Sequence, residues 1–227
     1  MLHDISVLVR HDTPEWPGDT PFSCGWTWER VKGASVNVSK FTTSPHVGTH
    51  ADAPLHVRDG WAGVEALPLD AFRGPAWILG VEDASALIEY EWIERRLPAR
   101  VETRLERLLL RTGRTVAEGR FPDTWPALSV ECAGHLVTRG LRLLGVDAPS
   151  VDTRESQELP VHHLLFLGGA YNLENLDLRG VPDGEYELTA YPLRIDGLDA
   201  APVRAVLERR AGAQSHLRGT LLALPMR

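Results

Sequence analysis

Residues 46–56 read HVGTHADAPLH, which places His46, His50, Asp52 and His56 within eleven positions. Imidazole and carboxylate groups together suit zinc and other borderline divalent cations, and each group can also move a proton. The four residues share sequence parity, so a pleated segment would direct all of them to one side. Full extension would nevertheless separate His46 from His56 by about 33 Å, too far for one ion to reach both.

The segment must therefore bend, and Gly48 and the pair Ala53-Pro54 are the expected places for it. Gly48 and Pro54 also argue against a helix here. A bent loop that holds histidines and a carboxylate is typical of a functional site. The alternative is a polar loop whose side chains are unrelated to one another.

A closed structural zinc site normally has four protein ligands, often including cysteine. The chain has two cysteines, Cys24 and Cys132, and neither is near this loop in the sequence. An open, catalytic site fits the residues better, with His46, His50 and Asp52 around one ion. His56 would then be free to act as an acid or base, because histidine titrates near neutral pH.

The 227 residues fit one domain, expected to span 1–227, or at most two small ones. Hydrophobic residues make up 43% and charged residues 24%, as in ordinary globular proteins. The net charge of −7 and the lack of a basic cluster argue against nucleic-acid binding. The apolar runs are too short to cross a bilayer, and the first residues do not resemble a signal peptide, so we expect a cytoplasmic protein with reduced cysteines.

The pattern of residues predicts strands and helices in mixed order. Strands are expected at 5–9, 25–31, 35–43, 76–81, 105–111, 141–146 and 186–195. Helices are expected at 89–97, 129–140, 160–167 and 201–210. Ser129 is the expected N-cap of its helix, and Pro160 and Pro202 are expected in the first turns of theirs. Strands and helices alternate only in the middle of the chain, which indicates a mixed α/β fold.

Two further features have both a functional and a plain interpretation. His162 and Glu174 could meet if the helix from Pro160 packs against residues 171–175, although the residues alone favour an unrelated pair. Trp16, before the turn Pro-Gly-Asp, could pack in the protein or offer an aromatic surface to a ring-bearing substrate.

The segment HVGTHADAPLH is similar to the His-x-Gly-Thr-His-x-Asp-x-Pro-x-His signature of the metal-dependent cyclase family. Within that family the chain most resembles the bacterial kynurenine formamidases, also called arylformamidases. The resemblance includes the segments DISVLVRHDTPEWPGDTPF, LPVHHLLFLGGAYNLENLDL and DGEYELTAYPLRIDGLDAAPVRAVL. It is weakest over residues 96–126, so substrate contacts from that region are left open.

The resemblance implies a single compact α/β domain of the swivelling β/β/α type with a mixed sheet, which forms a homodimer. It also implies two zinc ions per subunit. His46, His50 and Asp52 match the ligands of one ion, and the second ion matches Asp52, His162 and Glu174. In this arrangement Asp52 and Glu174 contact both ions, which reverses the preference for an unrelated pair.

The resemblance further implies that His56 transfers protons and that Trp16 lies against the substrate ring. The implied reaction is hydrolysis of a small aryl formamide, N-formyl-L-kynurenine, to L-kynurenine and formate during tryptophan degradation. One alternative is a sister enzyme of the family that opens another cyclic or aryl amide, such as isatin. A more distant alternative is a metal-stabilised binding module without catalysis.

Overall fold

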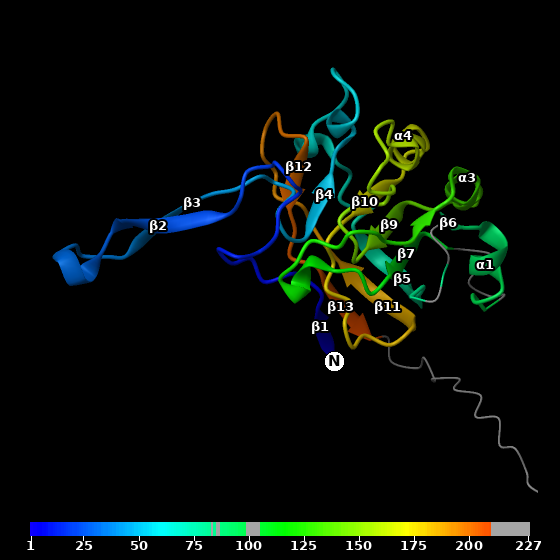
Figure 1. Cartoon of the computed structure of the whole chain (residues 1–227), viewed down its shortest axis with the longest axis horizontal. Coiled ribbons are helices and arrows are strands. Elements are labelled where there is room, and N and C mark those ends of the chain that lie inside the picture. The colour runs from blue at the N-terminus through cyan, green and yellow to red at the C-terminus, as the bar shows by residue number, and fades with distance from the viewer. Residues whose placement is uncertain (83, 85–86, 99–104, 210–227) are drawn as a thin grey trace, which may run out of the picture.

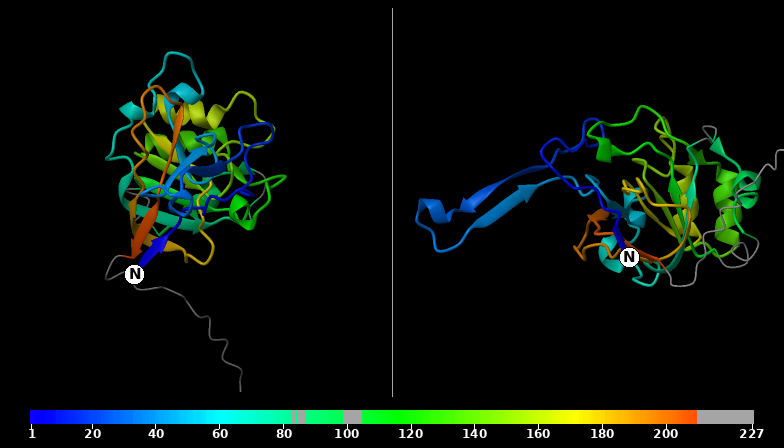
Figure 2. Two further views of the ribbon diagram at one scale, coloured as in Figure 1. Left: turned by 90° about the vertical axis from the view of Figure 1, so that its left-hand side faces the viewer. Right: turned by 90° about the horizontal axis from the view of Figure 1, so that it is seen from below.

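The computed structural model describes residues 1–82, 84, 87–98 and 105–209. A seven-stranded sheet forms the middle layer, with helices over one face and a small two-stranded sheet over the other (Figures 1 and 2). In spatial order its strands are β1 (Leu2–Asp4), β13 (Val206–Arg209), β11 (Gly184–Thr189), β5 (Arg73–Gly80), β7 (Arg107–Arg111), β9 (Leu143–Val146) and β10 (Tyr171–Leu173). Neighbours from β5 to β10 run parallel and those from β1 to β5 run antiparallel, so the mixed α/β fold is confirmed.

The helical layer packs on the parallel half of this sheet. It consists of α1 (Tyr90–Glu94), α3 (Val130–Thr138) and α4 (Pro160–Leu167). The hydroxyl of Ser129 accepts a hydrogen bond from the backbone N–H of Cys132 at 3.1 Å, which confirms the predicted N-cap of α3. Strand alternation divides the core, because Leu108 and Leu144 face the helices whereas Leu109 and Leu143 face the other layer.

The opposite layer carries the histidine-rich segment. Strand β4 (His50–Asp52) pairs antiparallel with β12 (Ala200–Pro202), and Asp52 lies opposite Ala200. The chain then enters a short 3-10 helix, η2 (Pro54–His56). The remaining elements are η3 (Val64–Ala66), η4 (Val116–Glu118) and the parallel pair β6 (Leu87–Ile88) and β8 (Ala127–Leu128).

A long hairpin projects from the body of the molecule (Figure 1). Its strands are β2 (Ser23–Trp28) and β3 (Val38–Thr42), which pair antiparallel. They are joined through the 3-10 helix η1 (Arg30–Lys32) and Gly33, whose φ of 93° is in the left-handed region that glycine tolerates. The two predicted strands and the turn between them are therefore confirmed.

The helix expected at 201–210 is wrong over its described part, where β12 and β13 are found instead. Ala201, Val203, Ala205 and Leu207 are buried, and the residues between them are half-buried or exposed. This period of two is that of a strand, and it outweighs the helix-start signal of Pro202.

The strand predicted at residues 5–9 is wrong, because β1 spans Leu2–Asp4 and only Ser6 of the predicted range forms a β-bridge, with Leu176. Ile5 is fully buried, and its N–H donates to the carbonyl of Ala205 at 3.0 Å. Both cysteines are free, Cys24 at the surface and Cys132 in the core. Among the described helices we find none with the length and apolar character needed to span a bilayer.

Candidate metal and active site

Two backbone segments bring the polar cluster together. His50 and Asp52 lie on β4, and Glu174 follows β10. The N–H of His50 donates to the carbonyl of Glu174 at 3.3 Å, and the N–H of Glu174 donates to the carbonyl of His50 at 3.1 Å. This bridge fixes the two segments side by side, so residues that are more than a hundred positions apart share one site.

The predicted bends bring the two ends of residues 46–56 together. Gly48 has a φ of 74°, and the chain turns into the 3-10 helix at Pro54. As a result the ring centroids of His46 and His56 lie only 4.5 Å apart. The interpretation of this segment as a folded site is therefore supported by its geometry.

One group of donor atoms surrounds Oδ1 of Asp52. Nδ1 of His46 lies 3.1 Å from this oxygen, and Nε2 of His50 lies 3.4 Å from it. His50 Nε2 and Asp52 Oδ1 are both buried and have no hydrogen-bond partner. Buried polar atoms are nearly always satisfied, and a cation held between these residues would satisfy both atoms at once.

A second group lies around Nε2 of His162. This nitrogen is 3.3 Å from Oδ2 of Asp52 and 3.1 Å from Oε1 of Glu174. The other oxygen of Glu174, Oε2, lies 3.6 Å from Nε2 of His50. Asp52 and Glu174 thus each direct one carboxylate oxygen toward His50 and the other toward His162. The structure brings His162 and Glu174 together, as the resemblance implied and the residues alone did not favour.

The outer ring nitrogens of the buried histidines are held by acceptors. Nδ1 of His50 donates to the carbonyl of Gly48 at 2.9 Å, and Nδ1 of His162 donates to Oδ2 of Asp152 at 2.7 Å. Histidines that bind metals usually have their second nitrogen fixed in this way, which directs the free lone pair into the site. The arrangement therefore fits an imidazole and carboxylate site for a borderline divalent cation.

Asp199 is a site residue that the sequence did not reveal. Its Oδ2 accepts hydrogen bonds from Nε2 of His46 at 2.9 Å and from Nδ1 of His56 at 3.1 Å. Asp199 directly precedes β12, so the pairing of β12 with β4 delivers it to the cluster. A motif search could not find it, because it lies 143 positions from His56.

Asn172 is a second residue that sequence reasoning missed. Its amide nitrogen donates to Oδ2 of Asp52 at 2.6 Å and to Oε1 of Glu174 at 3.1 Å. It lies on β10, two residues before Glu174, so strand alternation directs both side chains to the same face. Asn172 therefore holds the two carboxylates in place relative to each other.

The carboxylates raise the pKa values of the buried imidazoles and so favour their protonated form. Burial alone would lower the pKa of His46, but hydrogen bonds to Asp199 and Asp52 outweigh it and raise the pKa to about 9. Burial likewise opposes charge on His50, and the negative charge of Asp52 raises its pKa to about 10. Burial raises the pKa of Asp52, and the neighbouring His50 and His162 bring it well below its ordinary value. Such a cluster gives up protons when a cation binds.

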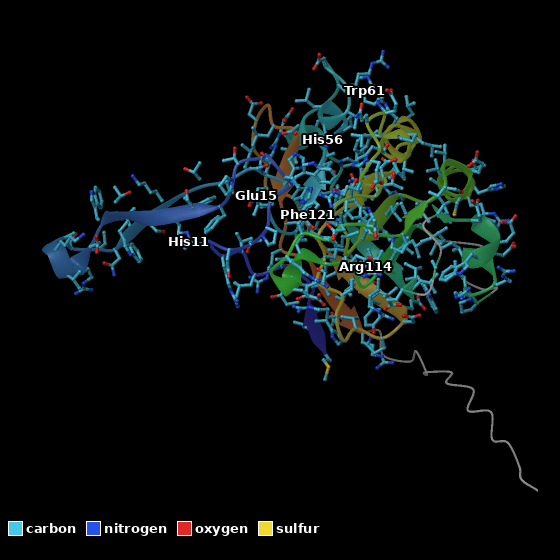
Figure 3. All side chains as sticks on the ribbon, in the orientation of Figure 1. His11, Glu15, His56, Trp61, Arg114 and Phe121 are labelled. Carbon is cyan, nitrogen blue, oxygen red and sulfur yellow. The ribbon has the colours of Figure 1, made fainter. Side chains whose placement is uncertain are left out.

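A cavity of about 340 Å³ opens beside this cluster. Figure 3 labels His56 and Phe121 on the side of the body from which the hairpin projects. The residues that line the cavity are Pro14, Trp16, Asp19, His46, His50, His56, Phe121, Pro149, Ser150, Ser156, Gln157, Leu159, His162, Glu174 and Asn175. The cavity is large enough for a small molecule, and its lining includes the histidine cluster.

An aromatic group forms part of the cavity wall. Trp16 is 40% exposed and packs edge-on against Phe121 and Trp125, with centroid distances of 5.3 and 6.1 Å. Phe121 comes from residues 96–126, the region in which the resemblance left contacts open. Trp16 therefore combines both interpretations, because it packs on other rings and also contributes to the cavity.

Two residues of the cavity wall have unusual backbone conformations. Leu159 and Asn175 have φ values of 44° and 54°, and they are the two non-glycine residues with positive φ in the described part of the chain. Leu159 precedes α4, which carries His162, and Asn175 follows Glu174. Strained residues tend to cluster at functional sites, and these two stand next to the elements that carry the polar cluster.

Comparison with known proteins identifies the relatives of this site. The family model Cyclase, described as "Putative cyclase", matches residues 3–153. The chain belongs to this family. It is 43% identical to the kynurenine formamidase of Bacillus mycoides (strain KBAB4) over 204 residues, which are 90% of this chain and 95% of that protein. It is 42% identical to the kynurenine formamidase of Bacillus anthracis with the same coverage.

Solved structures of the family share the fold. A potential metal-dependent hydrolase with cyclase activity is similar with a TM-score of 0.76 and 26% identity, covering 93% of this chain and 99% of that one. Isatin hydrolase A from Ralstonia solanacearum has a TM-score of 0.76 at 21% identity and covers 91% of each chain. The fold of this chain is thus that of the cyclase-family hydrolases.

Proposed function

We propose that this protein is a metal-dependent formamidase that hydrolyses N-formyl-L-kynurenine to L-kynurenine and formate. The observation that carries the proposal is the cluster of His46, His50, Asp52, His162 and Glu174 at the wall of a partly aromatic cavity. Kynurenine formamidases that are 41–43% identical over 90% of the chain support the choice of substrate.

The cluster is proposed to hold two zinc ions. His46, His50 and Asp52 would hold one, and Asp52, His162 and Glu174 would hold the other. The unpartnered His50 Nε2 and Asp52 Oδ1 support the first group, and the contacts of His162 with both carboxylates support the second. When bound, such ions polarise a carbonyl group and lower the pKa of water, so that hydrolysis proceeds at neutral pH.

His56 is proposed to move the proton of the reaction. Because its Nδ1 donates to Asp199, its Nε2 is the nitrogen left to exchange a proton with water or substrate. His56 would take a proton from the attacking water and deliver it to the aryl nitrogen as the formyl C–N bond breaks. The delivery matters because an aryl amine leaves poorly as an anion, and general acid catalysis removes that charge.

Trp16 and Phe121 are proposed to hold the aromatic ring of the substrate. Both side chains line the cavity that the histidine cluster borders. Aromatic rings pack favourably edge to face or offset, and the pair already has an edge-to-face arrangement with a centroid distance of 5.3 Å. The ring would thus be held in the cavity while the formyl group points to the cluster.

Side-by-side assays test this proposal. Zinc-loaded protein should hydrolyse N-formyl-L-kynurenine, followed by the change in absorbance, with a much higher kcat/KM than isatin. Removal of the metal by a chelator should stop turnover, and addition of zinc should restore it. Turnover of isatin without turnover of the formamide would assign the protein to a sister activity. A protein that unfolds on metal removal and has neither activity would be a metal-stabilised binding module.

A further inference from the structure

Residues 150–152, between β9 and α4, are buried and contact the second group of donor atoms. We call them the support segment. The carboxylate of Asp152 accepts hydrogen bonds from the backbone N–H groups of Val161 at 3.0 Å and His162 at 3.1 Å, both in the first turn of α4. It also accepts one from Nδ1 of His162 at 2.7 Å. The support segment therefore fixes the start of the helix and the orientation of the His162 ring.

The same segment also holds Glu174. The N–H of Val151 donates to Oε1 of Glu174 at 2.9 Å, and this oxygen lies 3.1 Å from Nε2 of His162. The hydroxyl of Ser150 accepts a hydrogen bond from the N–H of Asp152 at 3.2 Å, which stabilises the turn of the segment. His162 and Glu174 are thus both bonded to one short stretch of backbone, and a displacement of that stretch would move both of them.

Trp125 joins the support segment to the aromatic wall of the cavity. Its Nε1 donates to the carbonyl of Asp152 at 2.8 Å, and the side chain is buried, with 4% exposed. Its ring packs edge-on against Trp16 and Phe121, with centroid distances of 6.1 and 6.2 Å. Both of these rings line the cavity. One buried tryptophan therefore contacts the cavity wall and the backbone that holds the second group.

A second contact between these parts of the chain is weaker. Nη1 of Arg154 donates to the carbonyls of Pro122 and Asp123 at 3.4 and 3.3 Å. The side chain of Asp123 is fully exposed, so water can replace bonds made there. Water cannot enter as easily at the buried carbonyl of Asp152, and a buried acceptor that loses its donor is costly. The bond from Trp125 is therefore the one expected to hold the support segment.

We propose that Trp125 is a positioning residue for the second metal group. Its indole N–H holds the support segment in place and thereby sets the geometry of His162 and Glu174. The inference rests on the proposed function in one respect, namely that these two residues hold an ion. Loss of the N–H should weaken binding of the second ion more than that of the first, because His46 and His50 lie on a different stretch of backbone.

The first experiment compares Trp125→Phe with Trp77→Phe. Trp77 packs against the same core cluster, and its buried Nε1 has no hydrogen-bond partner in the described part of the chain. Both variants remove the same atoms, but only Trp125→Phe breaks a hydrogen bond. Competition with a chromophoric chelator should show zinc affinity reduced by roughly 3- to 10-fold in Trp125→Phe, the effect of one hydrogen bond, and unchanged in Trp77→Phe. Equal affinities in the two variants would overturn the proposal.

A second replacement separates the hydrogen bond from packing. In 3-benzothienylalanine a sulfur atom takes the place of the indole N–H, so the shape of the side chain is kept and the donor is lost. Introduced at position 125, it should reduce zinc affinity as Trp125→Phe does. A lower melting temperature of the metal-free protein with unchanged zinc affinity would mean that Trp125 only stabilises the fold, and the positioning role would be refuted.

Zinc titration in two further backgrounds identifies the ion that is affected. His46→Ala removes a proposed ligand of the first ion, and His162→Ala removes one of the second. Trp125→Phe should weaken zinc binding in the His46→Ala background and have no further effect in the His162→Ala background, because residues that act together are not additive. An equal effect in both backgrounds would contradict a role specific to the second group.

These titrations use zinc alone, so they do not depend on turnover. The expected loss of zinc affinity, in a protein that fails to hydrolyse the formamide, would support the positioning role and contradict the proposed reaction. Formamidase activity in the wild type, together with wild-type zinc affinity in Trp125→Phe, would contradict the positioning role and leave the proposed reaction intact.

Discussion

Nδ1 of His56 lies 3.1 Å from Oδ2 of Asp199, although 143 positions separate the two residues. The same oxygen accepts a hydrogen bond from Nε2 of His46. Asp199 thus connects the proposed proton-transfer residue to a proposed metal ligand. A carboxylate in this position fixes the tautomer of each imidazole and directs its other nitrogen.

Replacement of Asp199 tests this connection. Asp199→Asn keeps the shape of the side chain but removes its charge, and its single carbonyl oxygen is a weaker acceptor for two imidazoles. We expect kcat to fall by about 10- to 100-fold, the usual effect of removing such a partner, with a smaller change in KM. The exposed Asp196, three residues earlier, provides the control Asp196→Asn. An unchanged kcat in Asp199→Asn would show that the carboxylate does not position His56.

His56→Ala should separate catalysis from metal binding. Loss of a general acid and base typically costs ~10²–10⁴-fold in rate, and we expect kcat to fall within that range. Zinc content measured by atomic emission should not change, because His56 is assigned to neither ion. His135→Ala, at an exposed position on α3, should keep full activity. Full kcat in His56→Ala would remove this residue from the mechanism.

Asp52→Ala should be more severe than any other single change in the cluster. One oxygen of Asp52 faces His46 and His50 and the other faces His162, so both proposed ions lose a ligand. We expect the variant to retain fewer than two zinc ions per chain after dialysis and to have no measurable turnover. Two tightly held zinc ions in Asp52→Ala would contradict the bridging role.

The sequence located the polar cluster better than it located the elements around it. His46, His50, Asp52 and His56 lie close together in the chain, so their spacing alone predicts a site. His162 and Glu174 required the resemblance, since only the packing of α4 beside β10 brings them together. Asp199 could not be predicted, because its place depends on the register between β12 and β4.

The wrong prediction of a helix over residues 201–209 also results from contacts between distant segments. Pro202 is compatible with the first turn of a helix and with a short strand, and local propensity does not distinguish these. The alternate burial of Val203, Ala205 and Leu207 depends on a sheet formed by distant segments. Tertiary pairing therefore decided the structure there.

Trp16→Ala should act mainly on substrate binding. The ring of Trp16 lines the cavity, and it packs against the rings of Phe121 and Trp125. We therefore expect KM for N-formyl-L-kynurenine to rise by about tenfold, equivalent to the ~1.4 kcal/mol typical of an aromatic contact, while kcat changes little. The same variant should lose less affinity for a small formamide that lacks a ring. An unchanged KM would leave Trp16 with a packing role alone.

Gly48→Ala should show how the bend in the histidine segment contributes to stability. Gly48 has a φ of 74°, and an added Cβ would lie 2.6 Å from Cγ2 of Val9. Gly60, with a φ of 77° and no atom within 4 Å of such a Cβ, provides the control Gly60→Ala. Both variants should lose about 1–2 kcal/mol from the left-handed backbone, and Gly48→Ala should lose a further ~1–3 kcal/mol from overpacking.

Urea unfolding of the chelator-treated proteins measures the difference in stability between Gly48→Ala and Gly60→Ala. Zinc binding should also weaken in Gly48→Ala and not in Gly60→Ala, because the carbonyl of Gly48 holds Nδ1 of His50 at 2.9 Å. Any movement of the backbone at residue 48 therefore turns the imidazole that is proposed to bind the metal. Equal losses of stability and equal zinc affinity in the two variants would show that the contact with Val9 does not constrain the bend at Gly48.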